Sequence, residues 1–121
     1  MLLVEQDPPT RELMGQVLDS KYEVEAVATY EAVIDRVRTQ SHYDGIVISL
    51  YPRDEERGKE VLRQIRAVDA HADTPVVAVC GPSHERSGDM LLEEGFDDAL
   101  QMPFSQAELL SVVHGIVEGD A

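Results

Sequence analysis

Polar residues that could do chemistry stand directly after three short apolar runs. Glu5, Gln6 and Asp7 follow Leu2-Leu3-Val4, Ser49 closes Ile46-Val47-Ile48, and Cys80 closes Val76-Val77-Ala78-Val79. Each run predicts a strand buried on both faces, and parallel strands bring their carboxyl ends to one edge of the sheet, where ligands bind. We therefore expect these side chains to share one crevice. Glu5 and Asp7 are weak candidates for holding a cation there, and the Ser49 hydroxyl is a poor nucleophile unless a base activates it.

Strand and helix patterns alternate along the whole chain, which predicts one α/β domain over residues 1–121. The sheet should be parallel, with helices on both faces. The apolar stripe of the first helix should bury Leu13, Met14, Val17 and Leu18. We expect strands at about 1–6, 22–28, 45–50, 76–80 and 98–102, and helices at about 10–20, 30–39, 58–68 and 83–94. A capping box of Ser105 and Glu108 predicts the start of the last helix. A loop is expected at 51–57.

The charge balance limits the partners of the domain. There are 24 acidic and 10 basic side chains, giving a formal charge of −14, which repels nucleic acid and anionic membranes. The same excess suits a high-salt cytoplasm, although ordinary acidic solubility is the simpler alternative. We expect a cytoplasmic protein, because the N-terminus has no signal-peptide pattern and no apolar run could span a bilayer. A single cysteine, Cys80, excludes an intramolecular disulfide and a cysteine-built zinc site.

Six segments, in this order and at this spacing, resemble the receiver domain of two-component response regulators. They are Leu2 to Pro8, Tyr43 to Leu50, Gly58 to Leu62, Thr74 to Val77, Glu94 to Asp98, and Met102 to Phe104. The resemblance covers nearly the whole chain. It implies a flavodoxin-like, chemotaxis-regulator-like sheet of five strands in the order 2-1-3-4-5 with five helices. It also implies a site that takes a phosphoryl group from a histidine kinase onto an aspartate, and a cis bond between Met102 and Pro103.

The match breaks down at the residues that carry the family's chemistry. Ser49 stands at the position of the acceptor aspartate, and Glu5 and Gln6 stand at the positions of the acidic pair that binds magnesium. Cys80 takes the position of the Ser or Thr that ends the fourth strand. Met102 takes the position of the lysine, and Ala99 that of the aromatic switch residue. A carboxylate attacks phosphohistidine as an anion, and magnesium neutralises the charge on the transferred group. The amide and the hydroxyl remove two charges from the magnesium cage, so Mg²⁺ is possible but not expected.

The sequence therefore favours a degenerate receiver, or pseudo-receiver, that is not an enzyme. It would act by protein contacts or as a homodimer through the fourth helix, fifth strand and fifth helix, at about residues 83–118. The alternative is a flavodoxin-like domain that binds a small molecule in a neutral crevice, but Gln6-Asp7-Pro8-Pro9 stands where a phosphate cradle would be glycine-rich.

Three smaller questions concern Cys80, the histidines and the chain ends. Cys80 is either inert core or a redox sensor, and no basic residue adjoins it to make the thiol reactive. The four histidines form no ligand spacing and are expected at the surface or at helix caps. Because Met1 already lies in the first expected strand and Ala121 closely follows the last helix, a fragment of a larger regulator is an open alternative to a stand-alone domain.

Overall fold

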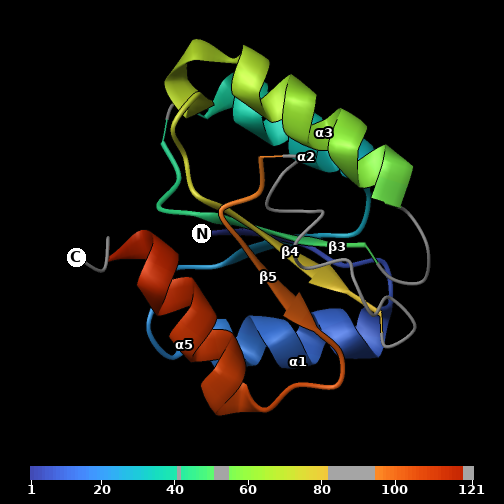
Figure 1. The fold of residues 1–121 in the computed structure, drawn as a ribbon, viewed down its shortest axis with the longest axis vertical. Coiled ribbons are helices and arrows are strands. Elements are labelled where there is room, and N and C mark those ends of the chain that lie inside the picture. The colour runs from blue at the N-terminus through green and yellow to red at the C-terminus, as the bar shows by residue number, and fades with distance from the viewer. Residues whose placement is uncertain (41, 51–54, 82–94, 119–121) are drawn as a thin grey trace.

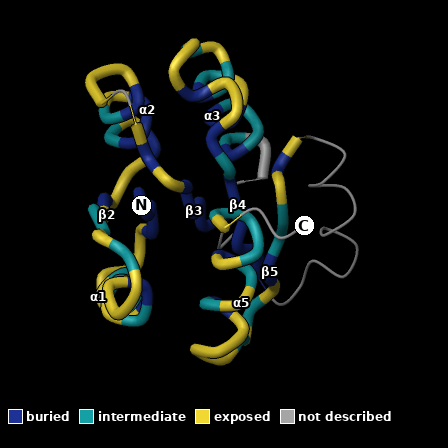
Figure 2. The backbone as a smooth tube through the Cα atoms, turned by 90° about the vertical axis from the view of Figure 1, so that its left-hand side faces the viewer, coloured by how far each residue is buried: buried dark blue, intermediate teal, exposed yellow. Residues whose placement is uncertain are grey.

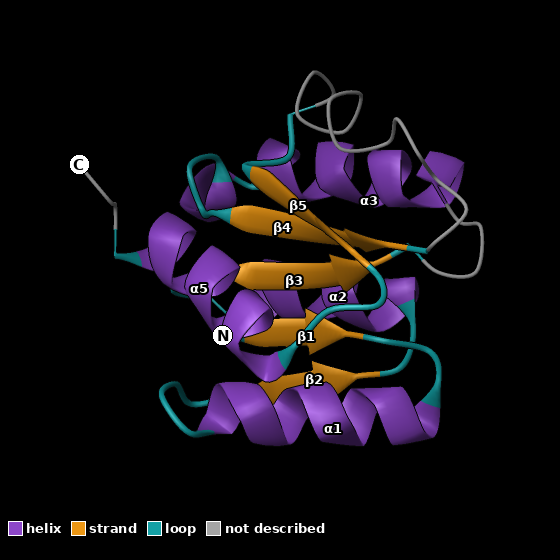
Figure 3. Ribbon diagram, turned by 60° about the horizontal axis from the view of Figure 1, so that its bottom comes forward, coloured by secondary structure: helices purple, strands orange, loops and turns teal. Residues whose placement is uncertain are grey.

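Five parallel strands form one sheet in the order β2-β1-β3-β4-β5, as predicted (Figure 3). The computed structural model describes residues 1–40, 42–50, 55–81 and 95–118, and the side chains of residues 55 and 56 are left out of the description. The strands point the same way, so their carboxyl ends share one rim of the sheet. Their bounds are β1 Leu2–Val4, β2 Glu25–Val27, β3 Ile46–Ser49, β4 Val76–Cys80 and β5 Asp98–Gln101.

Helices cover both faces of this sheet. In Figure 1, α2 and α3 lie on one side of the strands and α1 and α5 lie on the other. The helices in the described ranges are α1 Pro8–Asp19, α2 Tyr30–Thr39, α3 Glu55–Ala67, the 3-10 helix η1 Asp69–His71, and α5 Gln106–Val117. The predicted helix at 83–94 lies outside the described residues. The predicted loop at 51–57 is wrong at its end, because α3 already begins at Glu55. Within the described ranges, every helix is too short or too polar to span a bilayer.

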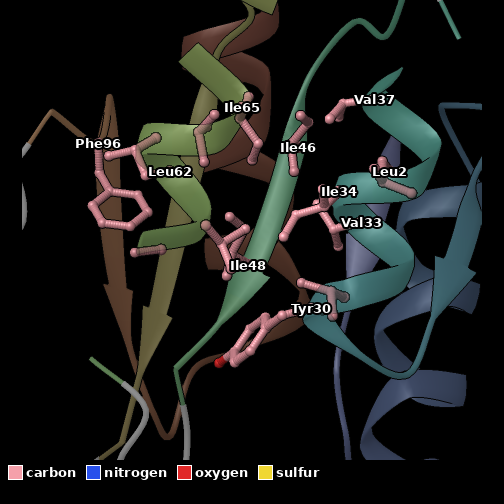
Figure 4. Close-up of a cluster of buried hydrophobic side chains, with 14 of the residues drawn as sticks. Leu2, Tyr30, Val33, Ile34, Val37, Ile46, Ile48, Leu62, Ile65 and Phe96 are labelled. Atoms are coloured by element: carbon pink, nitrogen blue, oxygen red, sulfur yellow. The ribbon is translucent and has the colours of Figure 1, made fainter. Parts of the chain in front are cut away.

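The core consists of two apolar layers, one on each face of the sheet. Side chains alternate along each strand, so neighbouring residues enter opposite layers. Figure 2 shows the buried strands between the more exposed outer surfaces of the helices. The α2/α3 core takes Leu2, Val4, Ile46, Ile48, Val76 and Ala78 from the sheet (Figure 4), whereas the α1/α5 core takes Met1, Leu3, Val47, Val79 and Leu100.

Capping side chains fix where the helices begin. Ser105 and Glu108 form the predicted capping box at α5, each accepting a hydrogen bond from the other's backbone N–H. Thr29 caps α2 by accepting from the Ala32 N–H. These caps satisfy donors that the first helical turn leaves without partners, so the helices start at defined positions beside the sheet.

Two residues differ from the sequence expectations. Leu13 was expected inside the α1 stripe but is 55% exposed, because Met14 and Leu18 occupy the side of α1 that faces the sheet. His71 was expected at the surface or at a helix cap but is fully buried. Its Nε2 lies 2.7 Å from the Gln40 carbonyl, which can only accept, so Nε2 donates this hydrogen bond, and Nδ1 lies 3.0 Å from the Thr74 hydroxyl.

Candidate functional site

Glu5 and Ser49 lie next to each other at the carboxyl rim of the sheet. The register pairs Val4 with Ile48. The next residue of each chain segment, Glu5 after β1 and Ser49 at the end of β3, therefore lies beside the other. Since Leu3 and Val47 enter the α1/α5 core, alternation directs Glu5 and Ser49 to that same face. Each residue is only 1% exposed. The structure thus brings together the two residues that stand for an acidic ligand and the phosphoacceptor.

Both side chains have a buried oxygen that lacks a hydrogen-bond partner among the described residues. One carboxylate oxygen of Glu5, Oε1, accepts from the Asp7 N–H at 3.0 Å, whereas Oε2 has no such partner. The Ser49 hydroxyl has none either. Buried polar groups are usually paired, and an unpaired one is costly. Within the described part of the chain, the rim therefore holds two buried oxygens, Glu5 Oε2 and Ser49 Oγ, without a hydrogen-bond partner.

Asp7 does not contribute its carboxylate to this pair. Its Oδ2 caps α1, accepting from the Thr10 N–H at 3.1 Å and from the Thr10 hydroxyl at 2.5 Å. These side-chain and backbone hydrogen bonds from Thr10 lower the pKa of Asp7 below its ordinary value. Gln6, the amide of the former acidic pair, is exposed. Arg11 donates from Nη1 to the Glu5 backbone carbonyl at 3.1 Å, so this contact does not neutralise the Glu5 carboxylate.

The remaining site positions fall on both faces of the sheet. Met102 is half-buried against the α1/α5 core, on the same face as Glu5 and Ser49. Cys80 belongs to the α2/α3 core, with its thiol 3.7 Å from the Leu100 carbonyl, and Ala99 packs against that core as well. The Met102-Pro103 bond is cis, as the resemblance implied. The residues predicted to share one crevice therefore separate. Glu5 and Ser49 lie together, whereas Asp7 caps α1, Gln6 is exposed and Cys80 lies in the α2/α3 core.

Sequence reasoning missed Tyr30, which anchors the end of β3. Its hydroxyl donates to the Ser49 carbonyl at 2.7 Å from a buried position in the α2/α3 core. Figure 4 shows the ring reaching from the start of α2 toward the end of the strand. The signal was present, because Tyr30, Val33, Ile34 and Val37 share the i, i+3, i+4, i+7 spacing of one helix face. This bond ties the backbone of the acceptor position to a helix.

The residues at the rim do not fit a magnesium ion. Mg²⁺ requires near-octahedral oxygen ligands and is usually held by one or two carboxylates together with phosphate oxygens. In the described ranges, no group of three or more Asp, Glu, His or Cys side chains could hold a metal. Glu5 offers one available oxygen, and the Asp7 carboxylate is engaged by α1. The donor set therefore disagrees with the cofactor that the family uses.

The family model of the response regulator receiver domain matches residues 1–114. The chain belongs to this family. Receiver domains are signalling modules of two-component systems, and the strand order and cis bond described above agree with this membership. No curated protein sequence matches the chain.

Solved structures of receiver domains superpose on almost the whole chain. The receiver domain of the sensor histidine kinase PA1611 from Pseudomonas aeruginosa, with a magnesium ion coordinated in its active-site cleft, is 27% identical, with a TM-score of 0.81 over 97% of this chain and 95% of that one. The signal receiver domain of a Luxo repressor protein from Vibrio parahaemolyticus is 24% identical, with a TM-score of 0.82 over 98% and 88%. The receiver domain of Francisella response regulator 1452 is 21% identical, with a TM-score of 0.81 over 99% and 97%.

Proposed function

We propose that this receiver domain accepts no phosphoryl group and signals through phosphorylation-independent contacts with other proteins. One observation carries the proposal: the strand end that should present the acceptor carboxylate presents the buried Ser49 hydroxyl, beside the single carboxylate of Glu5. A serine hydroxyl needs a base to become a nucleophile. Glu5 could take this role only if it approached the Ser49 hydroxyl, and the two side chains are not hydrogen-bonded to each other.

The other substitutions support the same conclusion. A phosphoryl group at the rim would bring about two negative charges into a site that already holds Glu5. Met102 supplies no cation to pair with these charges, and Arg11 is engaged with a backbone carbonyl. Bound phosphate is stabilised by charge-assisted hydrogen bonds. Ser49 therefore removes the acceptor carboxylate, and Met102 removes the cation that would stabilise the phosphoryl group. We accordingly assign no metal cofactor and no catalytic turnover to the domain.

A receiver without phosphorylation needs no two-state switch. Ligands shift a conformational equilibrium only through different interactions with the two states. In this proposal no bound phosphoryl charge is present to shift the equilibrium. The switch pair of the family is also replaced, with Cys80 in the α2/α3 core and the small Ala99 at the position of the aromatic residue. We propose that it holds one conformation in the cytoplasm and presents a constant surface to its partner. The family's output face at 83–118 lies partly outside the described residues.

The test is phosphotransfer from acetyl phosphate in the presence of Mg²⁺, followed by intact-mass spectrometry. We expect no mass increase in the natural chain. A matched control carries Gln6→Asp, Ser49→Asp, Cys80→Thr and Met102→Lys, which restore the family's residues on the same fold. Gain of one phosphoryl mass by the control, and none by the natural chain, supports the proposal. Phosphorylation of the natural chain at any rim residue contradicts it.

A further inference from the structure

The outer edge of β2 carries backbone groups that no strand pairs with. Figures 2 and 3 show β2 as the outermost strand of the sheet, next to α1. The Glu25 N–H donates to the Met1 carbonyl at 2.9 Å. The Val27 carbonyl accepts from the Glu5 N–H at 3.1 Å. Because alternate residues of a parallel strand bond to the same neighbour, the N–H and C=O of Ala26 point away from β1, and within the described residues they have no hydrogen-bond partner.

A cavity of about 430 Å³ lies beside this edge, between β2 and α1. From β2 it is lined by Val24 and by Ala26, which is exposed, so no bulky side chain covers the backbone there. The Ala26 side chain faces α1, because its register partner Leu3 enters the α1/α5 core. On α1, a Cβ added at Gly15 would meet no atom within 4 Å, so the space beside the helix is open. The other lining residues, all on α1, are Pro8, Arg11, Glu12, Gln16 and Asp19.

The charges at this cavity favour a cationic occupant. Glu12 and Asp19 line it with exposed carboxylates. Asp19 is the last residue of α1, where the helix dipole is already negative, and the last turn of α1 has no basic residue to offset that charge. The guanidinium of Arg11 donates from Nη1 to the Glu5 backbone carbonyl. A lysine or arginine that enters the cavity therefore meets two carboxylates and the negative end of a helix.

The free edge also selects the conformation of the occupant. A helix pairs its own N–H and C=O groups internally, whereas an extended segment can pair with those of Ala26. A segment placed beside β2 would direct every second side chain into the cavity. A second copy of the chain is a poorer occupant, since each copy has a formal charge of −14 and both would bring the same carboxylates to the contact.

We propose that the outer edge of β2 binds an extended basic segment of a partner protein as an additional strand of the sheet. The backbone of that segment pairs with the N–H and C=O of Ala26, and its lysine or arginine side chains enter the cavity toward Glu12 and Asp19. The contact lies at the opposite edge of the sheet from β5. The inference rests on the proposed function, because it names the surface and the kind of partner through which a phosphorylation-independent receiver would act.

A short synthetic peptide of alternating lysine and valine serves as the probe. Fluorescence anisotropy measures its affinity, and amide chemical shifts of the labelled domain locate it. A control peptide has glutamate in place of lysine. Two further peptides are methylated at the backbone nitrogen, one at its lysines and the other at its valines. Because the N–H groups of successive residues in a strand point to opposite edges, each of these peptides lacks the donors along one edge only.

Variants of the domain test the cavity. Gly15→Leu places a side chain in it, and Gly115→Leu makes the same change on α5, where an added Cβ also meets no atom within 4 Å. A double variant, Glu12→Gln with Asp19→Asn, removes the two carboxylates without changing the backbone edge. Circular dichroism checks that each variant folds, and the double variant tests the proposal even if Gly15→Leu does not fold.

We expect saturable binding of the lysine peptide, with shifts confined to α1 and β2. Gly15→Leu should weaken binding about 10-fold or more, the double variant about 3-fold or more, and Gly115→Leu should leave it unchanged. One methylated peptide should bind like the parent peptide and the other should not bind.

The proposal is overturned by absent binding, by shifts elsewhere, by equal binding of the glutamate peptide, or by two methylated peptides that behave alike. Unaltered affinity of Gly15→Leu or of the double variant also overturns it. A dimer that Gly15→Leu dissociates has the same consequence, because the occupant is then a second copy. Phosphorylation of the natural chain refutes the proposed function without changing these binding results, so the two failures are distinguishable.

Discussion

Replacement of Ser49 by aspartate should destabilise the fold, although it restores the family's acceptor. The strand register places the introduced carboxylate beside Glu5, on strands about 4.8 Å apart. Two charges roughly 5 Å apart repel by about 3 kcal/mol at an effective dielectric constant of about 20. Serine to asparagine at the same position adds similar volume without charge. We therefore expect Ser49→Asp to be less stable than Ser49→Asn by about 3 kcal/mol near pH 7.

Urea unfolding followed by circular dichroism measures this difference. Burial and Glu5 raise the folded-state pKa of the introduced carboxyl. The penalty is therefore absent below the unfolded pKa of about 3.9, grows as pH rises from there toward the folded pKa, and is complete above it. Adding Met102→Lys should stabilise Ser49→Asp, where the lysine faces two carboxylates, more than it stabilises Ser49→Asn, where it faces Glu5 alone. Equal stability of the two single variants near pH 7, within about 0.5 kcal/mol, refutes the reasoning that Glu5 lacks a neutralising partner.

Three further predictions concern packing, ionisation and salt. Gly58→Ala should lower the unfolding free energy by about 1–3 kcal/mol in urea titration. The added Cβ would overlap with Cδ2 of the buried Leu50, and this clash outweighs the gain in helix propensity; an unchanged or higher midpoint contradicts this packing. Burial, reinforced by the hydrogen bond to Glu25, raises the pKa of Tyr43 to about 12. The free energy of unfolding should therefore fall between about pH 10 and 12, because the unfolded state loses the Tyr43 proton first. Ultraviolet absorbance follows the ionisation and urea unfolding follows the stability, and Tyr43→Phe should flatten the fall. The melting temperature should rise from low to molar potassium chloride because counterions screen the −14 charge; a flat profile removes the halophilic interpretation.

Periodicity in the sequence was sufficient to predict the alternation of strands and helices and most of the core, whereas the strand order followed from the resemblance to receiver domains. A continuous apolar run such as Ile46-Val47-Ile48 is buried on both faces only when helices cover both sides of the sheet. The strict alternation of strands and helices along the chain then favours parallel pairing of the strands. The Ser105 capping box likewise specified the start of α5. In these cases a local physical requirement, either burial or hydrogen bonding, determines the structure.

Other features depend on tertiary packing and could not be predicted from spacing. Leu13 has the helical spacing of a core residue, yet the neighbours on α1 determine which side faces the sheet. His71 looks like a loop histidine, and its burial depends on the Gln40 carbonyl, which lies 31 residues away in the sequence, as well as on the nearby Thr74 hydroxyl. The sequence predicted that Glu5 and Ser49 share the rim, but the face of the sheet to which both side chains point required the strand register, because a shift of one residue would reverse it.

Titration with magnesium and beryllium fluoride, a phosphoryl mimic, tests the central claim most directly. Under the proposed function, amide spectra of the labelled natural domain should show no saturable change at Glu5, Ser49 or Met102. Ser49 stands where the resemblance places the acceptor carboxylate, and the described residues include no group of three or more Asp, Glu, His or Cys side chains that could hold a metal. The four-residue control variant should respond. Saturable, magnesium-dependent shifts at these positions in the natural domain would contradict the account.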